Sequence, residues 1–255
     1  MNYIVTGGSG FIGSHLVQHL LKNGHSVINI DNFDDFYDYQ IKIKNTLESI
    51  GKTLEFSFHE KELDIQKLIF ETSSNNYHLY YQDIRDKEGL EKIFTKHKVD
   101  AIIHLAALAG VRPSIADPMA YQEVNIKGTM NLWELCKAFN ITKFLNASSS
   151  SVYGNNSKIP FSELDAVDEP ISPYAATKKC TEILGHVYHH LYRINMVHLR
   201  FFTVYGPRQR PDLAISKFTT FINSHQEIPF YGDGSTARDY TYIDDIIDGI
   251  LKSIH

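Results

Sequence analysis

Tyr174 and Lys178 are a pair of residues whose types and spacing could do acid–base chemistry. They stand at positions i and i+4 of the segment SPYAATKK, which places both side chains on one face of a helix. A tyrosine is a poor base at its usual pKa of about 10, but a neighbouring ammonium would stabilise the phenolate and lower that value. Two surface residues at helical spacing would look the same, so the pair alone leaves both interpretations open.

A glycine-rich turn, TGGSGFIG, follows the apolar run YIVT and opens an amphipathic stretch. Gly8, Gly10 and Gly13 fit the dinucleotide-binding pattern, and Gly7, Gly10 and Gly13 fit its variant. Glycine allows a tight turn, close approach of backbone N–H groups to a pyrophosphate, and close packing of helix and strand. The context favours a dinucleotide site over a glycine turn in a nucleotide-free protein.

An acidic residue ends the next predicted strand. Asp31 stands where a carboxylate would accept a hydrogen bond from a ribose 2′-hydroxyl and would repel a 2′-phosphate. No Arg or Lys follows until Lys42, whereas Asp34, Asp35 and Asp38 do. The sequence therefore predicts NAD rather than NADP.

The elements that must position these residues alternate between short apolar runs and longer amphipathic ones. This β-α order predicts an α/β fold, a Rossmann-like doubly wound parallel sheet with helices on both faces. Strands are expected at 3–7, 26–31, 78–86, 99–107, 143–148 and 196–202. Helices are expected at 11–24, 87–97, 120–140 and 174–195.

Two regions depart from that alternation. Residues 51–78 are too long for a plain connection and are expected to form an embellishment. We expect residues 1–203 to form the NAD-binding domain and residues 204–255 a small, incomplete C-terminal substrate-binding lobe. The final strand and amphipathic helix, TYIDDIIDGILKSIH, are expected to return to the first domain.

Composition excludes several classes of protein. The 255 residues carry a formal net charge of −5 with no block of Lys or Arg, which argues against a nucleic-acid partner. No apolar run approaches the length of a membrane span, and MNYIVTGG shows no signal peptide. Cys136 and Cys180 read as packed thiols, so a cytoplasmic protein is expected. His186, His189 and His190 are interpreted as packed or solvated, and no metal is expected.

The order of several motifs resembles the extended short-chain dehydrogenase/reductase superfamily. These motifs are TGGSGFIG, Asp31, HLAALAG, a serine run before VYG, YAATK and RFFTVYGPRQRPD. Within the superfamily, DNFDDFYD, LAGVRPS, RPDLAISKF and RDYTYIDD look like the UDP-glucuronate 4-epimerases.

The resemblance implies a Tyr-x-x-x-Lys mechanism with tightly held NAD. Tyr174 would take the proton of the sugar 4-hydroxyl while a hydride leaves C4, and both would return on the other face of the 4-keto sugar. Lys178 would hold the nicotinamide ribose and, with the nicotinamide charge, lower the pKa of Tyr174. Ser149, four residues before Tyr153, would align the hydroxyl.

The resemblance also implies a set of cofactor contacts. Asp83 would lie at the adenine edge, although its position alone fits a solvated turn equally well. The whole set is Gly7, Gly10, Phe11, Ile12, Gly13, Asp31, Asn32, Asp83, Ile84, Leu105, Ala106, Ala107 and Ser148, with Tyr174 and Lys178.

The two positions after Ser149 discriminate between reactions. Related 4,6-dehydratases carry Asp-Glu there and UDP-glucuronate decarboxylases carry Glu in the second place, whereas this chain has Ser150 and Ser151. Elimination therefore lacks its acid and base. We expect Ser150, Ser151 and Thr203 to donate hydrogen bonds to the C6 carboxylate of a uronate. The alternative is that the serines merely close a strand end.

The phosphates of a UDP-sugar need cationic partners. By resemblance, Arg210 and Arg238 would face the diphosphate and Arg112 would lie near the sugar, while Lys217 is a weaker candidate. Without the resemblance, each would be interpreted as a surface residue.

Other functions stay open at this point. A UDP-hexose 4-epimerase or a UDP-glucuronate decarboxylase-like enzyme uses the same framework. Members of the family run past the YIDD helix, so an NAD-binding fragment without turnover is a further alternative of a different class. The helix after Tyr-x-x-x-Lys often forms a dimer interface in the superfamily, so a homodimer is expected.

Overall fold

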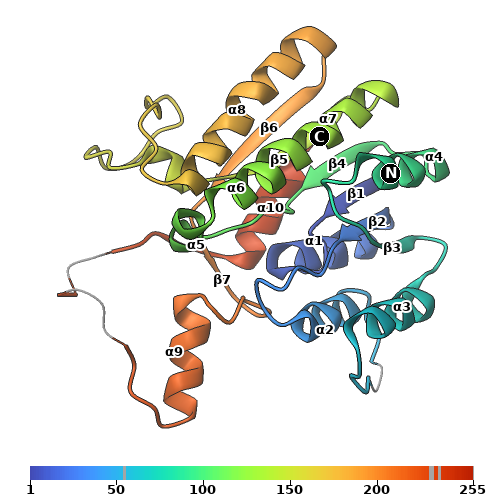
Figure 1. Cartoon of the computed structure of the whole chain (residues 1–255), viewed down its shortest axis with the longest axis horizontal. Coiled ribbons are helices and arrows are strands. Elements are labelled where there is room, and N and C mark those ends of the chain that lie inside the picture. The colour runs from blue at the N-terminus through green and yellow to red at the C-terminus, as the bar shows by residue number, and fades with distance from the viewer. Residues whose placement is uncertain (54–55, 230–232, 235–236, 255) are drawn as a thin grey trace.

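A six-stranded parallel sheet forms the centre of the computed structural model, which describes residues 1–53, 56–229, 233–234 and 237–254 (Figure 1). The strand order is β3-β2-β1-β4-β5-β6, the order of a Rossmann sheet. This confirms the predicted α/β class and parallel pairing. The strands are β1 Asn2–Thr6, β2 Ser26–Asp31, β3 Tyr77–Tyr81, β4 Ala101–His104, β5 Lys143–Ser149 and β6 Asn195–Phe201.

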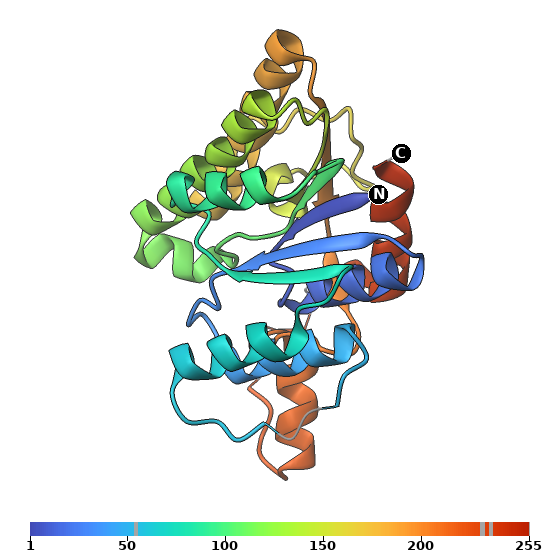
Figure 2. The same ribbon diagram turned by 90° about the vertical axis from the view of Figure 1, so that its right-hand side faces the viewer.

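Helices cover both faces of the sheet, as Figure 2 shows. On one face, α1, α2, α3 and α10 bury their apolar side chains against Tyr3, Val5 and Ile103. On the other, α4, α7 and α8 pack against Ile4 and Phe144. Successive residues of β1 thus enter opposite layers, because side chains alternate along a strand. The bounds are α1 Phe11–Lys22, α2 Tyr39–Ser49, α3 Lys61–Thr72, α4 Lys87–Lys96, α7 Thr129–Ala138, α8 Pro173–Tyr192 and α10 Ile243–Ser253.

Helix α2 was not predicted, whereas residues 51–78, expected to form a helix or an embellishment, do contain a helix. Within 51–78 the structure forms α3 and then the start of β3 at Tyr77, with residues 54–55 outside the description. Asp38 caps α2 by accepting the Gln40 N–H at 2.9 Å. That capping aspartate was the sequence signal for the helix.

The long helix predicted at 120–140 is divided into three segments. They are α6 Pro118–Tyr121, the π-helical η1 Gln122–Gly128 and α7, preceded by the short α5 Val111–Ala116. Within η1, the Asn125 side chain accepts the Leu108 N–H at 2.9 Å and donates to the Leu108 carbonyl at 3.0 Å. The wider turn therefore holds the loop after β4, and β4 itself ends at His104 rather than Ala107.

The last fifty residues form a second small sheet and two helices. Strands β7 Thr203–Tyr205 and β8 Tyr240–Tyr242 pair in parallel, and α9 Ala214–Asn223 lies between them in the chain. Helix α10 places Ile243, Ile247 and Ile250 in the same core as β1 and α1. The division of the chain at residue 203 stays a prediction.

Two further observations concern the described residues as a whole. None of their helices has the length and apolar character needed to cross a bilayer. Cys136 is buried and Cys180 is half-buried, and neither forms a disulfide.

Candidate active site

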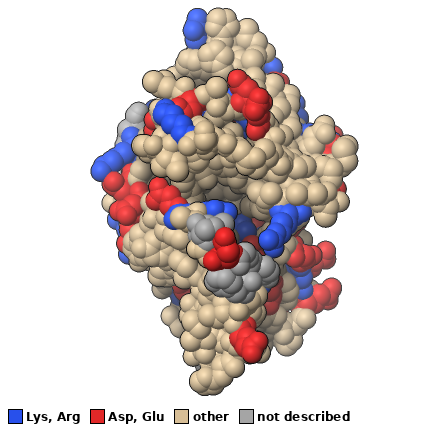
Figure 3. Space-filling model, turned by 90° about the vertical axis from the view of Figure 1, so that its left-hand side faces the viewer, with Lys and Arg blue, Asp and Glu red and all other residues tan. Residues whose placement is uncertain are grey.

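A cavity of about 480 Å³ opens at the carboxyl ends of the parallel strands, where ligands bind in sheets of this type. Figure 3 looks onto this side of the molecule and shows a central hollow with Lys and Arg side chains at its rim. The predicted glycine turn, the end of β5 and the start of α8 all contribute to its wall. The sheet thus brings segments from distant parts of the sequence to one place.

The glycine turn has no room for side chains. A Cβ on Gly13 would lie 2.1 Å from the Gly7 carbonyl oxygen, and Gly7 itself has a φ of +70°. Gly7, Gly10 and Gly13 line the cavity, whereas a Cβ on Gly8 would meet the Asn29 side chain. Of the two glycine patterns left open by the sequence, the structure therefore turns Gly7, Gly10 and Gly13 toward the ligand space. The cradle leaves the backbone open to a pyrophosphate at the start of α1.

Asp31 is held in place at the end of β2. Its side chain is 5% exposed, and its two oxygens accept the Phe33 N–H at 2.8 Å and the Ser9 N–H at 3.1 Å. Lys42 Nζ lies 3.7 Å from Asp31 Oδ1 and also lines the cavity. From the sequence, Lys42 was identified only as the first basic residue after Asp31. Its place in the site was missed because α2, the helix on which it lies, was not predicted.

Asp83 lies beside the main cavity rather than in its wall. It borders a smaller adjoining hollow together with Asn32, whose amide donates to Asp83 Oδ2 at 3.0 Å. Burial alone would raise the pKa of Asp83, but hydrogen bonds from Arg85 and Asn32 hold it below its usual range. Ile84 lines the main cavity.

The loop after β4 is anchored by a buried histidine. His104 joins Thr6 Oγ1 at 2.6 Å and Thr129 Oγ1 at 2.9 Å, and Thr6 Oγ1 accepts the Ala106 N–H at 3.2 Å. Burial lowers the pKa of His104 to about 3, so the imidazole is neutral. His104 therefore positions the backbone at 105–107, which lines the cavity.

Tyr174 and Lys178 both enter the cavity from the first turns of α8, which begins after the N-cap Ser172. Lys178 Nζ donates to the Ala147 carbonyl at 2.6 Å and lies 6.0 Å from the centre of the Tyr174 ring. Burial lowers the pKa of Lys178 to about 8. The predicted juxtaposition of the two side chains is thus present in the structure.

Opposing influences act on the phenol. The pKa of Tyr174 is raised on balance, because burial raises it more than the neighbouring Ser149 hydroxyl and the charge of Arg210 lower it. The lowering that sequence analysis assigns to Lys178 and the nicotinamide charge stays a prediction.

The serine run is ordered, not a solvated linker. Ser149 ends β5 and caps the 3₁₀ helix η2 (Ser150–Tyr153), where its hydroxyl accepts the Ser151 N–H at 3.1 Å and donates to Ser151 Oγ at 3.0 Å. All four serines line the cavity. The Ser148 hydroxyl, however, donates to Glu182 at 2.5 Å, so it is already engaged on the α8 side.

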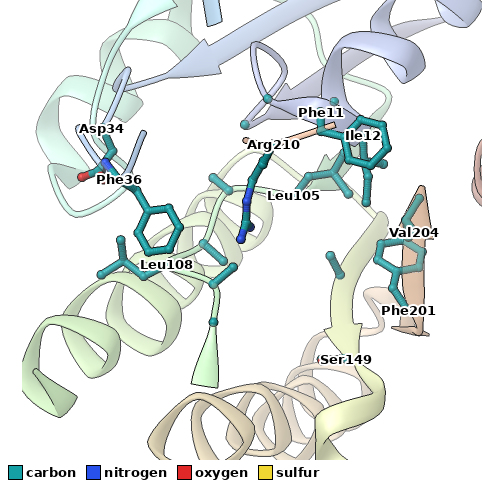
Figure 4. A pocket seen from close by; sticks show the side chains of 18 of the residues that line it. Phe11, Ile12, Asp34, Phe36, Leu105, Leu108, Ser149, Phe201, Val204 and Arg210 are labelled. Carbon is teal, nitrogen blue, oxygen red and sulfur yellow. Dashed lines mark hydrogen bonds between the residues drawn. The ribbon is translucent and has the colours of Figure 1, made fainter. Parts of the chain in front are cut away.

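Of the predicted phosphate and sugar ligands, Thr203, Arg210 and Arg238 line the cavity. Arg210 pairs through two nitrogens with Asp212, at 2.9 and 2.7 Å, and Figure 4 shows it extending into the cavity between Phe36 and Leu105. Its guanidinium lies 5.1 Å from the centre of the Phe36 ring.

Arg112 and Lys217 do not line the cavity. Arg112 stands at the exposed start of α5, and Lys217 lies on α9 with its ammonium 5.6 Å from the Phe221 ring centre. The proposed contacts of both residues with a UDP-sugar stay predictions.

Several lining residues escaped sequence reasoning. Besides Lys42 they include Phe36, Tyr37 and Val124. Burial, with the charge of Asp31, raises the pKa of Tyr37, and the Lys42 ammonium lies 5.1 Å from its ring centre. The available signal was the aromatic run FDDFYD between β2 and α2, a stretch that also contributes to the family resemblance.

Metal chemistry finds no support in this part of the molecule. Among the residues described, no group of three or more His, Cys, Asp or Glu side chains is arranged to hold a metal ion. The titratable side chains of the cavity wall include Tyr174 and Lys178, with Asp31, Asp34 and Lys42 on the β2 side.

Comparison with known proteins agrees with this geometry. The family model of the NAD dependent epimerase/dehydratase family matches residues 3–255. The chain belongs to this family. The glycine cradle, the fixed carboxylate of Asp31 and the paired Tyr174 and Lys178 fit NAD, the cofactor of the family.

Relatives in the family include sugar-nucleotide epimerases. A UDP-glucuronate 4-epimerase of Thermodesulfobacterium geofontis is 43% identical over 252 residues, which cover 99% of this chain and 71% of that protein. The crystal structure of a Bacillus cereus UDP-glucuronic acid 4-epimerase, in complex with UDP-glucuronic acid and NAD, has a TM-score of 0.84 at 37% identity and covers 100% of this chain and 73% of its own. A UDP-glucose 4-epimerase of Thermotoga maritima has a TM-score of 0.82 at 32% identity, with 100% and 74% covered.

Proposed function

We propose that this protein is an NAD-dependent isomerase that interconverts UDP-glucuronate and UDP-galacturonate by transient oxidation at C4 of the sugar. The family supports the epimerase chemistry and the cofactor. Relatives about 40% identical that act on UDP-glucuronate support the uronate as substrate. The arrangement of the cavity agrees with both.

The observation that carries the proposal is the chemistry of the serine end of the cavity. Ser149, Ser150, Ser151 and Thr203 offer neutral hydroxyls there. Among the described lining residues, the carboxylates are Asp31, which ends β2, and Asp34, which follows it, and β2 is separated from β5 by two strands. A dehydratase or decarboxylase needs an ionisable group beside the sugar, whereas a C6 carboxylate is held well by hydroxyl donors.

The proposed reaction uses Tyr174 as base and then as acid. Tyr174 takes the proton of the sugar 4-hydroxyl, which the neighbouring Ser149 hydroxyl aligns. NAD, when bound, supplies the hydride acceptor and donor for C4. Lys178, 6.0 Å from the ring centre, favours the phenolate, and Tyr174 returns its proton after the keto sugar has turned over.

Arg210 is assigned to the diphosphate of the substrate. Asp212 holds its guanidinium in one orientation, and the charge of Arg210 lowers the pKa of Tyr174 as well. Because Nε and Nη2 already donate to Asp212, the Nη1 side of the guanidinium is assigned to the phosphate oxygens. Arg238, which lies two residues before β8, is also assigned to the diphosphate.

We also infer a homodimer formed through α8. Ile183, Val187 and Leu191 stand four residues apart on this helix and are 55%, 41% and 59% exposed. An apolar stripe of this spacing favours packing against another helix. Sedimentation measurements test this inference directly, and a monomer at micromolar concentration would contradict it.

The function is tested by incubating the purified chain with UDP-glucuronate and following the sugar by NMR. Appearance of the galacturonate epimer is the expected result. Release of CO₂ would move the protein to the decarboxylases. Epimerisation of UDP-glucose with no turnover of UDP-glucuronate would move the protein to the UDP-hexose 4-epimerases. The UDP-glucose 4-epimerase of Thermotoga maritima has a similar fold.

A further inference from the structure

One face of α8 contacts the end of β5 at successive turns. Lys178 and Glu182 stand four residues apart on this face, in line with Tyr174. Lys178 Nζ donates to the Ala147 carbonyl, and Glu182 Oε1 accepts the hydroxyl of the next residue, Ser148, at 2.5 Å. Tyr174 and Ser149 both line the cavity, and the Ser149 hydroxyl is near enough to lower the pKa of Tyr174. The face that carries the catalytic pair thus continues one turn further, to a carboxylate that the reaction itself does not use.

Arg200 on β6 completes this arrangement. It is the register partner of Ser148 and donates through Nε and Nη2 to the two oxygens of Glu182, at 3.0 and 2.9 Å. Its third nitrogen, Nη1, donates to the Tyr153 hydroxyl at 3.2 Å, and the guanidinium lies 5.0 Å from the Tyr153 ring centre. The ion pair therefore contacts both Ser148 and Tyr153.

These two contacts bracket the residues that face the sugar. Ser148–Tyr153, the serine segment, begins at the residue bonded to Glu182 and ends at the residue bonded to Arg200. Ser149, Ser150 and Ser151 lie between them and line the cavity. Because both ends bond to one ion pair, a shift of that pair would move the hydroxyls between them.

The pair is sheltered enough to act as a fixed point. The side chains of Arg200 and Glu182 are 18% and 10% exposed. Burial alone would raise the pKa of Glu182, but Arg200 and Ser148 hold it below its usual range. Fork-shaped pairing of arginine with carboxylate fixes the relative orientation of the two groups as well as their distance.

We propose that the Glu182–Arg200 ion pair is a positioning device that holds the serine segment at both ends and so sets the place of Ser149 relative to Tyr174. This inference rests on the proposed function for the role of Ser149. Neither Glu182 nor Arg200 is a catalytic residue, because both lie outside the cavity wall. A pair that only stabilises the fold would lower thermal stability and leave the turnover of the folded protein unchanged.

The kinetic experiment compares Glu182→Gln with a matched control. Glu48→Gln removes the charge from another arginine–glutamate pair, Glu48–Arg208, whose further partner is Gln18 on α1 rather than the serine segment. We expect kcat of the Glu182→Gln variant to fall about tenfold with little change in KM, and kcat of Glu48→Gln to stay within twofold of the wild type. Arg200→Lys, which keeps the charge but loses the fork and the Tyr153 contact, is expected to lower kcat similarly.

A double-mutant cycle separates positioning from a general loss of structure. In a Ser149→Ala background, Glu182→Gln should lower kcat less than twofold, because the group that it positions is already gone. A tenfold loss in both backgrounds would overturn the inference. So would a Glu182→Gln variant with kcat within twofold of the wild type.

A spectroscopic titration keeps the test independent of the sugar. Tyrosinate absorbance of the NAD-loaded protein, minus that of Tyr174→Phe, follows ionisation of Tyr174 alone among the 15 tyrosines. Ser149→Ala is expected to raise the apparent pKa of Tyr174, and Glu182→Gln to produce at least half of that rise. A rise in the serine variant without one in Glu182→Gln would overturn the positioning role. The titration measures the pKa of Tyr174 without any sugar present, so it tests the positioning role even if UDP-glucuronate is the wrong substrate.

Discussion

The cofactor side and the sugar side of the cavity are built from different materials. The cofactor side, formed by the glycine turn and Asp31, is largely backbone, with no room for a Cβ at Gly13 and a carboxylate that is 5% exposed. The sugar side, formed by the serine segment, Thr203 and the arginines, consists of side chains on segments that follow β5 and β6. Arg238 on this side is exposed and donates to its own neighbour, the Ala237 carbonyl.

This difference teaches where specificity can be changed in the fold. A site made of backbone tolerates few substitutions, but it recognises features that all dinucleotides share. A site made of hydroxyl and guanidinium groups can be altered one side chain at a time without disturbing the sheet. Tyr174 stands between the two sides, and its replacement should therefore affect turnover while leaving the glycine turn and Asp31 intact.

Replacing Tyr174 by Phe should have the largest effect. Loss of a positioned proton-transfer group typically costs a factor of 10² to 10⁴, so we expect kcat to fall about 1000-fold. NAD affinity, measured by fluorescence quenching, should change less than threefold because the glycine cradle is untouched. A variant that loses NAD as well would show that the two sides are not separable at this residue.

Substitution at Gly13 should break the cofactor side itself. A Cβ there would lie 2.1 Å from the Gly7 carbonyl oxygen, which is backbone and cannot give way cheaply. We expect Gly13→Ala to lower the free energy of unfolding by about 3 kcal/mol, as for an overpacked core, and to weaken NAD binding at least tenfold. Urea denaturation and NAD titration measure the two effects.

Gly249→Ala is the matched control for Gly13→Ala. A Cβ at Gly249, on the outer part of α10, meets no heavy atom within 4 Å. Alanine favours a helix by about 1 kcal/mol over glycine, so this variant should be slightly more stable than the wild type and bind NAD normally. Equal destabilisation by both substitutions would contradict the steric argument.

The contrast between the two sides also explains what could be predicted from the sequence. The strands, the glycine turn and the helices α1, α4 and α8 depend on local periodicity and local turn chemistry. The order of residues along the chain was therefore enough to predict them. β2, predicted at 26–31, matches the structure from Ser26 to Asp31. Helical spacing supplied the pairing of Tyr174 with Lys178, and the family resemblance added Ser149. The roles assigned to these residues stay predictions.

The features that were missed depend on contacts distant in the sequence. Lys42 reaches Asp31 only because α2 folds back across the end of β2. The π-helical turn of η1 depends on Asn125 bonding to Leu108, 17 residues earlier. The bond of the Ser148 hydroxyl to Glu182, on another element, was also not predicted, while the contact of Ser148 with the cofactor stays a prediction. No local pattern reports such pairs.

Two arginines test how the sugar side is held together. Arg210 is fixed by Asp212 and lies inside the cavity, whereas Arg238 is exposed and donates to the Ala237 carbonyl at 2.8 Å. A charge-assisted bidentate contact contributes about 2 kcal/mol or more. We expect Arg210→Met to raise KM for the UDP-sugar about 50-fold and Arg238→Met about threefold. The reverse order would place the diphosphate nearer to β8.

The buried ammonium of Lys178 should make stability depend on pH. Its pKa is lowered to about 8 in the folded protein, against about 10.5 in the unfolded chain. Between these values the unfolded chain binds more protons, so the contribution of Lys178 to stability rises with pH and is least favourable below about pH 8. Measured by urea unfolding without NAD, the difference between wild type and Lys178→Met should shift by about 2 kcal/mol toward the wild type from pH 7.5 to 10. A difference that stays flat would mean that Lys178 is already neutral or well solvated.

The smallest effect should be the most informative about the substrate. Replacing Ser151 by alanine removes only the contact in which Ser151 Oγ accepts the Ser149 hydroxyl. The backbone N–H of residue 151 still donates to Ser149 Oγ, so the fold of the segment is kept. If its hydroxyl binds the C6 carboxylate, Ser151→Ala should lower kcat/KM for UDP-glucuronate about fivefold, as one charge-assisted hydrogen bond would. Turnover of UDP-glucose, which has no carboxylate, should then change less than twofold. Equal losses on both sugars would show that the neutral serines close the strand end and do not select the uronate.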